Sequence, residues 1–202
     1  MSLKVLIISD IHGSYRSLNR INASIYKHEL DSVVVCGDIT HFGDKEEAVD
    51  ILEKIDAELI MGVTGNCDPI DVEESFDIIG GVNLNLNIHS YKGYSFAGLA
   101  GHNHTKQDLS RFRDLAKSAD IFVLHSPPYG YLDEASRGKH IGERELLEII
   151  SKYSPRLILS GHVHESRGII QEEGTVYVNP GPAYEDNLAI VEIGEEIKAK
   201  LI

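Results

Sequence analysis

The chain has 202 residues, of which 42% are hydrophobic and 25% are charged, and its formal net charge is −13. A chain of this length can bury the core of a sizeable domain without disulfides, so we expect one globular domain over residues 1–202. The negative charge counts against nucleic acid and anionic lipid as partners, because both repel an acidic surface. Cations held by the protein would supply positive charge locally.

The start of the chain and its cysteines bear on location. The first apolar run stops at Asp10 and is too short for a signal peptide or a membrane span. Cys36 and Cys67 are the only cysteines, and two such thiols are more often buried or close to a metal than bridged. We therefore expect a cytoplasmic protein without a disulfide or a membrane partner. The sequence leaves the oligomeric state open and allows a dimer.

Short apolar runs rich in Val and Ile recur in the first third of the chain, at residues 3–9, 32–37 and 58–63. Runs of this kind predict strands that are buried on both faces. Helical patterns separate them, and Asp44 with Glu47 three residues on predicts a capping box at the start of the second helix. This alternation predicts βαβ units with parallel strands.

The pattern changes after residue 80. Residues 82–100 are typical of hairpin strands that turn at Lys92 and Gly93. The elements expected next are a helix at residues 106–118, a strand at 121–125, a helix at 142–153 and a strand at 156–160.

From Gly168 to the end, the chain predicts β-hairpins that turn at Glu173–Gly174 and near Gly194, with no further helix. The whole pattern predicts an α/β protein in which mixed strands form two sheets.

Polar side chains with metal-binding chemistry follow five of the predicted strands. They are Asp10 and His12, then Asp38, Asn66 and His125, and finally His162 and His164. Because ligands of open α/β folds bind where the carboxyl ends of strands meet, we expect these side chains to converge. The mixture of oxygen and imidazole donors suits Mn²⁺, Fe, Zn²⁺ or Ni²⁺ better than Ca²⁺ and is large enough for two ions.

Each signal alone has an ordinary alternative. Asp38 fits a tight turn, and His125 fits a buried structural histidine. Five such groups in this order, all at strand ends, predict a metal centre.

Five segments resemble, in order, the motifs of the calcineurin-like metallophosphoesterases: Asp10-Ile-His12, Gly37-Asp38, Gly65-Asn66-Cys67-Asp68, the strand-ending His125 and Gly161-His162-Val163-His164. The segments His125-Ser-Pro-Pro-Tyr-Gly and Val178-Asn-Pro-Gly-Pro-Ala are similar to the compact prokaryotic branch of that superfamily, archaeal and bacterial. The resemblance implies a four-layer αββα sandwich of two mixed β-sheets flanked by helices. It also implies a hydrolase that acts on phosphoesters at a dinuclear metal centre.

The resemblance implies a role for each residue of these motifs. One ion would be held by Asp10, His12 and His164, the other by Asn66, His125 and His162, and both by Asp38. A carboxylate suits the bridging position because it offers two oxygens, whereas an imidazole offers one free nitrogen. We favour Mn²⁺, with Ni²⁺, Zn²⁺, Fe or Mg²⁺ as alternatives, and expect a hydroxide shared by the ions to attack phosphorus.

Cys67 departs from the family pattern. Many members carry a His directly after the Asn of the Gly-Asn motif, where it helps to protonate the leaving oxygen. A thiol beside two cations tends toward thiolate and donates a proton poorly. We therefore hypothesise that His104, or as the weaker candidate His102, is a substitute proton donor or phosphate clamp. The competing interpretations are a polar loop at residues 99–104 and a small packed residue at Cys67.

Residues 99–104, Leu-Ala-Gly-His-Asn-His, nearly repeat residues 159–164, Leu-Ser-Gly-His-Val-His. The later copy follows the predicted strand at residues 156–160 and has His125 before it, as the motif order requires. The earlier copy would need His89 as the preceding ligand, and no strand-end loop follows His89. We assign the metal to the later copy and place the earlier one on the rim.

Two further residues are candidates for contacts around the metals or the substrate. His41 lies three residues after Asp38, close enough to approach the metals, and the alternative interpretation is a solvated loop residue. Asp68 either orients a metal ligand or caps a turn.

The function that we favour is hydrolysis of a small phosphodiester. Diesters carry less charge and often have better leaving groups, which suits an enzyme that lacks the usual histidine. The alternatives are a nuclease, against which the net charge counts, and a non-catalytic scaffold, which would not need an intact set of seven ligands.

Overall fold

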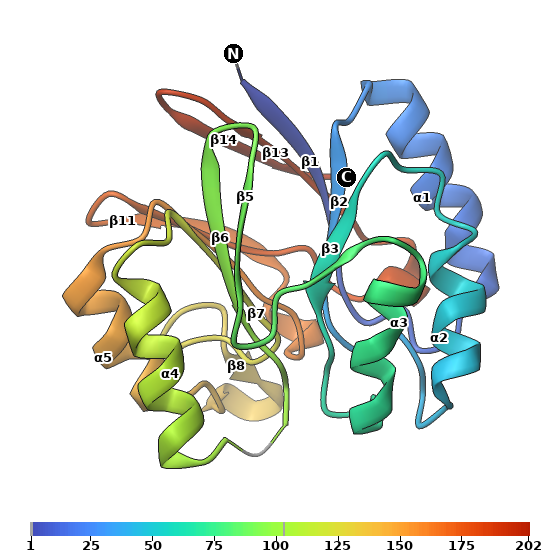
Figure 1. Ribbon diagram of the computed structural model, residues 1–202. Helices are drawn as coiled ribbons and strands as arrows, with labels where there is room; N and C mark the ends of the chain where they lie inside the picture. Colours follow the sequence, from blue (N-terminus) through green and yellow to red (C-terminus); the bar gives the residue numbers. More distant parts are fainter. Residues whose placement is uncertain (1, 103) are drawn as a thin grey trace.

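Two six-stranded sheets face each other in the computed structural model, which describes residues 2–102 and 104–202 (Figure 1). The first sheet has the order β14 (Ile197–Leu201), β13 (Ala189–Ile193), β1 (Leu3–Ile8), β2 (Ser32–Cys36), β3 (Ile60–Val63) and β4 (Val82–Asn83). The second has the order β11 (Gly168–Glu172), β12 (Thr175–Asn179), β10 (Leu157–Leu159), β7 (Ile121–Leu124), β6 (Tyr94–Leu99) and β5 (Ile88–Tyr91).

Helices cover the outer face of each sheet (Figure 1). Those on the first sheet are α1 (Tyr15–His28), α2 (Lys45–Leu52) and α3 (Glu74–Ile78), and those on the second are α4 (Lys106–Ala116) and α5 (Arg144–Tyr153). The short 3₁₀ helices are η1 (Ile70–Glu73), η2 (Ser136–Gly138), η3 (His164–Ser166) and η4 (Ala183–Glu185), and a small hairpin pairs β8 (Glu134–Ala135) with β9 (Lys139–His140). The four-layer αββα sandwich expected from the sequence is therefore confirmed.

The apolar strands are buried on both faces because three separate cores fill the spaces between the four layers. In β1, Val5 and Ile7 point into the core between the sheets, whereas Leu6 and Ile8 point into the core under the helices of the first sheet. The same alternation in β7 sends Val123 to the central core and the residues on either side of it to the helices of the second sheet. Continuous Val and Ile runs are what such doubly covered strands require.

Two helix starts show how local sequence defines these elements. At α2, the Asp44 carboxylate accepts a hydrogen bond from the Glu47 N–H at 2.9 Å, so half of the predicted capping box is present. The Glu47 carboxylate lies beside Gly43 instead of returning to Asp44. A complete capping box occurs at α4, where Thr105 and Asp108 satisfy each other's backbone N–H groups.

The structure differs from the sequence prediction in several places, among them the β8–β9 hairpin, which the sequence does not indicate. β4 does not join the hairpin formed by β5 and β6 but pairs in parallel with β3 in the other sheet. The helices η1 and α3 were not predicted, because their apolar residues are too few to show a helical period. The short helix η4 lies between the two C-terminal hairpins, so the prediction of no further helix after Gly168 is wrong at this position.

All strands that precede the expected ligands run in the same direction within their sheets. β1, β2 and β3 are parallel neighbours, and β6, β7 and β10 are parallel neighbours in the second sheet. The loops after these strands therefore leave from one end of the sandwich, the lower end in Figure 1.

Candidate metal centre

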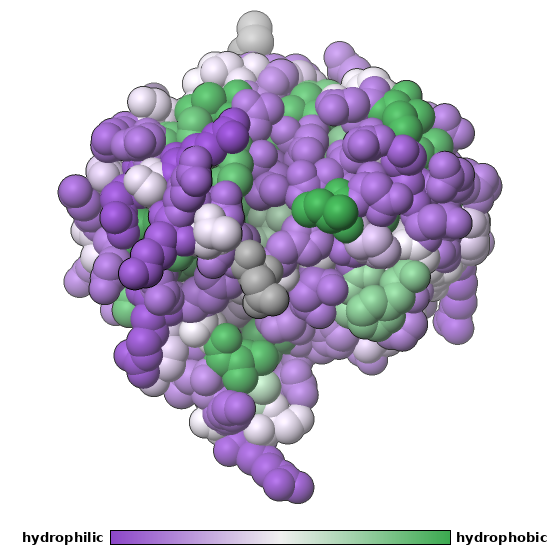
Figure 2. All heavy atoms as spheres, turned by 60° about the horizontal axis from the view of Figure 1, so that its bottom comes forward, coloured by the Kyte–Doolittle hydropathy of each residue, from purple (hydrophilic) through white to green (hydrophobic). Residues whose placement is uncertain are grey.

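Seven predicted ligands lie in the loops at this end of the sandwich. Asp10 and His12 follow β1, Asp38 follows β2, Asn66 follows β3, His125 follows β7 directly, and His162 and His164 follow β10. Figure 2 shows this end turned toward the viewer, with separate apolar spots on a mostly hydrophilic surface. The expected convergence of the seven residues therefore has a structural basis in the parallel strands.

Asp38 lies between two groups of imidazoles. Its Oδ1 atom accepts a hydrogen bond from the backbone N–H of Cys67 at 2.8 Å, which fixes the carboxylate. Its Oδ2 atom lies 3.7 Å from His12 Nε2 and 3.6 Å from His125 Nε2. One oxygen of a nearly buried carboxylate thus faces both groups of ligands.

The first group contains Asp10, His12 and His164, whose ligand atoms lie within 4.8 Å of one another. The Oδ1 atom of Asp10 is 3.1 Å from His164 Nε2 and 3.8 Å from His12 Nε2. Burial of Asp10 acts to raise its pKa, but the hydrogen bond to His164 and nearby imidazoles outweigh it and lower the pKa. The same hydrogen bond raises the pKa of His164.

The second group contains Asn66, His125 and His162. The Oδ1 atom of Asn66 is 2.9 Å from His125 Nε2, and the rings of His125 and His162 meet at 4.9 Å between centroids. Burial, followed by the neighbouring His125, lowers the pKa of His162. A neutral imidazole is the form that binds a metal.

The orientation of His125 tests whether this second group suits a metal ion. Its Nδ1 atom lies 2.8 Å from the carbonyl oxygen of Cys36, which only accepts hydrogen bonds, so Nδ1 carries the proton. The Nε2 lone pair then faces the oxygens of Asn66 and Asp38. Lone pairs that converge without a proton between them suit a bound cation, and a backbone carbonyl behind the ring is the usual support of a metal-ligating His.

The backbone of four predicted ligands is strained. Asp10, His12, Asp38 and His162 have φ values of +56°, +48°, +51° and +65°. The left-handed region costs a non-glycine residue free energy, and such residues concentrate at functional sites. The fold holds these side chains at the site against a local preference for other conformations.

Asp68 braces the loops that carry Asp38 and Asn66. Its carboxylate accepts hydrogen bonds from Ile39 N at 3.1 Å, Thr40 N at 2.8 Å, Thr40 Oγ1 at 2.9 Å and Gly65 N at 2.8 Å. It contacts the backbone beside the ligands, so it positions two ligand loops at once. Burial raises the pKa of this carboxyl.

The two Gly-His segments flank His125 from opposite sides, because β7 lies between β6 and β10. A Cβ atom at Gly101 would lie 2.3 Å from His125 Cδ2 and 2.7 Å from Asn66 N. A Cβ atom at Gly161 would lie 1.8 Å from Ser9 Oγ and 2.7 Å from Asp10 Oδ2. Both loops therefore pack against the centre through a glycine.

The histidines of the earlier copy turn to other partners. His102 Nε2 is 3.2 Å from Thr64 Oγ1 and 3.8 Å from Glu73 Oε1. His104 Nε2 is 4.0 Å from Glu143 Oε1, with the His104 side chain 11% exposed. Burial raises the pKa of Glu143, which also interacts with Ser126, the residue after His125.

His41 and Cys67 lie beside the first group. His41 Nδ1 is 3.4 Å from His12 Nδ1, and His12, His41 and Cys67 each offer a ligand atom within 4.8 Å of the others. Burial and then the charge of Asp38 raise the pKa of Cys67 to about 12. The raised pKa applies without bound ions, whereas the thiolate expected from the sequence requires two cations beside the thiol.

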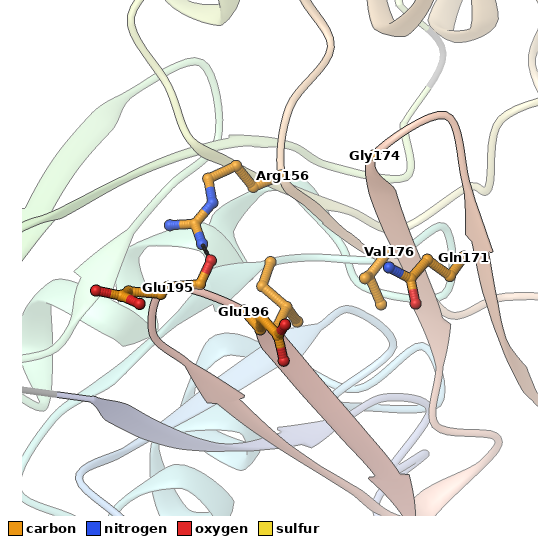
Figure 3. A pocket seen from close by; sticks show the side chains of 7 residues that line it. Arg156, Gln171, Gly174, Val176, Glu195 and Glu196 are labelled. Carbon is orange, nitrogen blue, oxygen red and sulfur yellow. Dashed lines mark hydrogen bonds between the residues drawn. The ribbon is translucent and has the colours of Figure 1, made fainter.

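A cavity of about 370 Å³ lies elsewhere, between the start of β10 and the turns of the C-terminal hairpins (Figure 3). Arg156 is its main cation, and the guanidinium donates hydrogen bonds to the carbonyl oxygens of Gly194 and Glu195 at 2.5 and 2.9 Å. Arg156 precedes β10, whereas the ligands follow that strand. This cavity is therefore at the opposite end of β10 from the candidate metal centre.

The chain belongs to the calcineurin-like phosphoesterase family, whose model matches residues 3–166. This confirms the resemblance, and the family implies divalent metal ions and action on phosphoesters. An uncharacterized protein of Methanocaldococcus jannaschii is 30% identical over 202 aligned positions, which cover 89% of this chain and 88% of that protein.

Two solved structures share the fold at lower identity. A dimetal phosphatase of Danio rerio has a TM-score of 0.73 and 12% identity, over 98% of this chain and 95% of that one. A protein described as a novel archaeal phosphodiesterase has a TM-score of 0.59 and 16% identity, over 99% of this chain and 100% of that one. Among the described residues, no helix is both long and apolar enough to cross a membrane.

Proposed function

We propose that this chain is a phosphodiesterase that uses two divalent metal ions to hydrolyse small phosphoesters. Mn²⁺ is the ion that we favour. One observation carries the proposal: Asp38 Oδ2 faces His12 on one side, at 3.7 Å, and His125 on the other, at 3.6 Å. A carboxylate between two groups of ligands is what a pair of ions with a shared ligand requires. Asp10, His12 and His164 hold one ion, and Asn66, His125 and His162 hold the other.

The chemistry divides between the ions and the chain. Two bound divalent cations supply Lewis-acid charge to the phosphoryl oxygens and activate water. Asp38 and Asn66 keep the two ligand groups in register, because Asp68 ties their loops together. The Cys36 carbonyl holds the ring of His125, so its Nε2 atom presents a lone pair to the centre.

The preference for a diester follows from charge. A diester carries one negative charge at neutral pH, whereas a phosphomonoester carries close to two. Two divalent ions offset the carboxylates of Asp10 and Asp38 at the centre itself, but a substrate approaches it through the long-range field of a chain whose net charge is −13. The less charged ester is repelled less during this approach. The same repulsion makes a nucleic acid a poor substrate.

We assign the proton for the leaving alcohol to His104. Cys67 follows Asn66 at the sequence position of the usual donor, and beside two bound cations its thiol tends toward thiolate, which has no proton to give. Glu143 lies 4.0 Å from His104 and belongs to the segment beside His125, so it supports the orientation of the imidazole.

The test is steady-state hydrolysis of an aryl phosphodiester and an aryl phosphomonoester by protein that has been stripped of metal and titrated with Mn²⁺, Ni²⁺, Zn²⁺ or Mg²⁺. We expect turnover to return with two equivalents of metal, most strongly with Mn²⁺, and to favour the diester. Asp38→Asn should remove it. Two tightly bound ions without turnover on either ester would contradict the proposal and favour a scaffold.

Asp120→Asn is the matched control. Asp120 directly precedes β7, at the opposite end of the strand from His125, and its carboxylate accepts hydrogen bonds from Ser95. An effect shared by both variants would therefore reflect general damage to the sheet. Loss in Asp38→Asn alone would assign the effect to the bridging carboxylate.

A further inference from the structure

Phe42 is an apolar side chain that the fold holds in solvent beside the metal centre. It is 68% exposed, and its φ of +61° lies in the left-handed region, which bulky residues rarely adopt. Its backbone N–H donates to the carbonyl of Cys67 at 2.9 Å, so the strained turn is fixed to the loop that carries Asn66. Neither exposure nor this conformation benefits folding, which points to a role in binding.

A series of rings connects Phe42 to the first ligand group. The centroids of Phe42 and His41 are 5.2 Å apart, and those of His41 and His12 are 5.3 Å apart. Tyr184 continues the series on the other side of His12, with its ring centroid 5.6 Å from those of His12 and His164. The ligands of the first group are thus bordered by aromatic rings that reach the surface.

The free face of Phe42 is directed at solvent rather than at protein. Its contact with His41 is T-shaped, with 66° between the ring planes, so His41 covers at most one face. A phosphoester that binds with its phosphoryl oxygens at the cations would extend its alcohol groups away from them, toward this rim. A planar group on such an alcohol meets an aromatic surface there.

We propose that Phe42 determines specificity by stacking against a planar aromatic group carried by an esterified alcohol of the substrate. The inference rests on the proposed function, because it concerns the substrate of the same site. Stacking of this kind joins two uncharged aromatic faces. It therefore adds affinity for the substrate without requiring further negative charge on it.

Binding of unreactive phosphonates tests the proposal without turnover. Phenylphosphonate and methylphosphonate are titrated calorimetrically into the metal-loaded wild type, Phe42→Ala, Phe42→Tyr and Tyr26→Ala. We expect Phe42→Ala to raise the dissociation constant of phenylphosphonate about two- to tenfold, with methylphosphonate unchanged. Phe42→Tyr should retain the preference. Tyr26 is the matched control, since it is 90% exposed on α1. Equal losses for both phosphonates, or none, would overturn the inference.

Thermal unfolding of metal-free Phe42→Gly separates a binding role from a structural one. Glycine adopts positive φ without steric cost, so we expect a melting temperature equal to or above that of the wild type. A clearly lower melting temperature would show that the ring stabilises the fold and would contradict the proposal. If the wild type hydrolyses no phosphoester, the proposed function fails, while the phosphonate ratios still decide the role of Phe42.

Discussion

His102 and Thr64 connect the two sheets next to the candidate metal centre, with His102 Nε2 3.2 Å from Thr64 Oγ1. Thr64 directly precedes the Gly65-Asn66 turn of the first sheet, and His102 follows β6 of the second. The backbone supports the same junction, because Gly101 N–H donates to the Thr64 carbonyl at 2.8 Å. The earlier Gly-His segment thus holds a loop of one sheet against the ligand loop of the other.

Gly101→Ala should damage the second ligand group more than the first. The added methyl group would lie 2.3 Å from the His125 ring and 2.7 Å from Asn66 N, so both must shift. Overpacking of this kind costs about 1–3 kcal/mol. Calorimetric metal titration should show one ion bound as in the wild type and one bound more weakly.

Gly194→Ala is the control for that substitution. Its methyl group would meet only ordinary contacts, at 3.6 Å or more, far from the centre in the β13–β14 turn. If Gly101→Ala binds both ions as tightly as Gly194→Ala does, the close approach at Gly101 has no role in positioning the ligands.

Asp68→Ala should be strongly destabilising even without metal. The substitution leaves the N–H groups of Ile39, Thr40 and Gly65 without their acceptor. Each unsatisfied buried group costs about 1–3 kcal/mol, so we expect a loss of about 3 kcal/mol or more in the free energy of unfolding. Urea unfolding of both proteins in the presence of a chelator measures this loss in the free energy of unfolding.

Asp68→Asn provides the graded comparison. An amide keeps one oxygen for two of the donors and turns its NH₂ group toward the others, so the loss should be smaller than for Asp68→Ala. Equal losses for the two variants would mean that the hydrogen bonds of Asp68 do not determine its contribution.

The His140–Asp133 pair should make a pH-dependent contribution to stability. The two side chains are 2.7 Å apart, and this contact raises the pKa of His140 above 6.5. Burial of Asp133 acts to raise its pKa, but His140 and the backbone of Gly130 and Gly142 outweigh it and lower the pKa below 3.8.

The raised pKa of His140 and the lowered pKa of Asp133 determine how the stability of the protein depends on pH. The contribution of His140 is fully present below pH 6.5 and is lost as the pH rises through the raised value. The contribution of Asp133 is present above pH 3.8 and is lost as the pH falls through the lowered value. His140→Ala should therefore destabilise the protein more at pH 5.5 than at about pH 9 in urea unfolding. In an Asp133→Asn background, this pH dependence should disappear.

Metal loading should raise the melting temperature in two steps. An ion at 100 times its dissociation constant stabilises the folded state by about 2.7 kcal/mol. For a chain of this size that corresponds to about 5–10 °C for each ion. Scanning calorimetry of stripped protein titrated with Mn²⁺ should show both steps, and Asp38→Asn should reduce their sum. A single step that ends at one equivalent would contradict a dinuclear centre.

His104→Ala should slow the hydrolysis of alkyl phosphoesters much more than that of activated aryl phosphoesters. A poor leaving group needs a proton in the transition state, and loss of the donor typically costs about 10²- to 10⁴-fold in rate. His89→Ala, in β5 of the same sheet, is the control. Unchanged alkyl ester hydrolysis in His104→Ala would eliminate His104 as the donor and leave it as part of the loop that faces Glu143.

Much of the fold and the set of candidate ligands could be predicted from local sequence. Each strand that leads to a ligand is a short apolar run that a glycine or a polar residue follows, so residue type indicates both the strand and its end. The side chains of Asp10, Asp38, Asn66 and His125 stand at those ends. Their convergence follows from the parallel direction of the strands, which buried apolar runs favour.

Other features depended on neighbours that are distant in the chain. The two Gly-His segments are nearly equal as sequence, and β7 places them on opposite sides of His125. Only their surroundings differ: His164 meets Asp10, whereas His102 meets Thr64 and Glu73. β4 pairs with β3, and its two residues are too few for the sequence to indicate which sheet it joins.

The sequence by itself thus determined the layered α/β class and the chemistry at the strand ends, because burial and turn formation depend on residue type and short-range order. The tertiary structure decided which histidines face the carboxylates, how Asp68 joins two ligand loops, and where Phe42 lies. These relationships depend on strand order and on backbone conformations such as the positive φ of Asp38 and Phe42, which packing imposes against local preference.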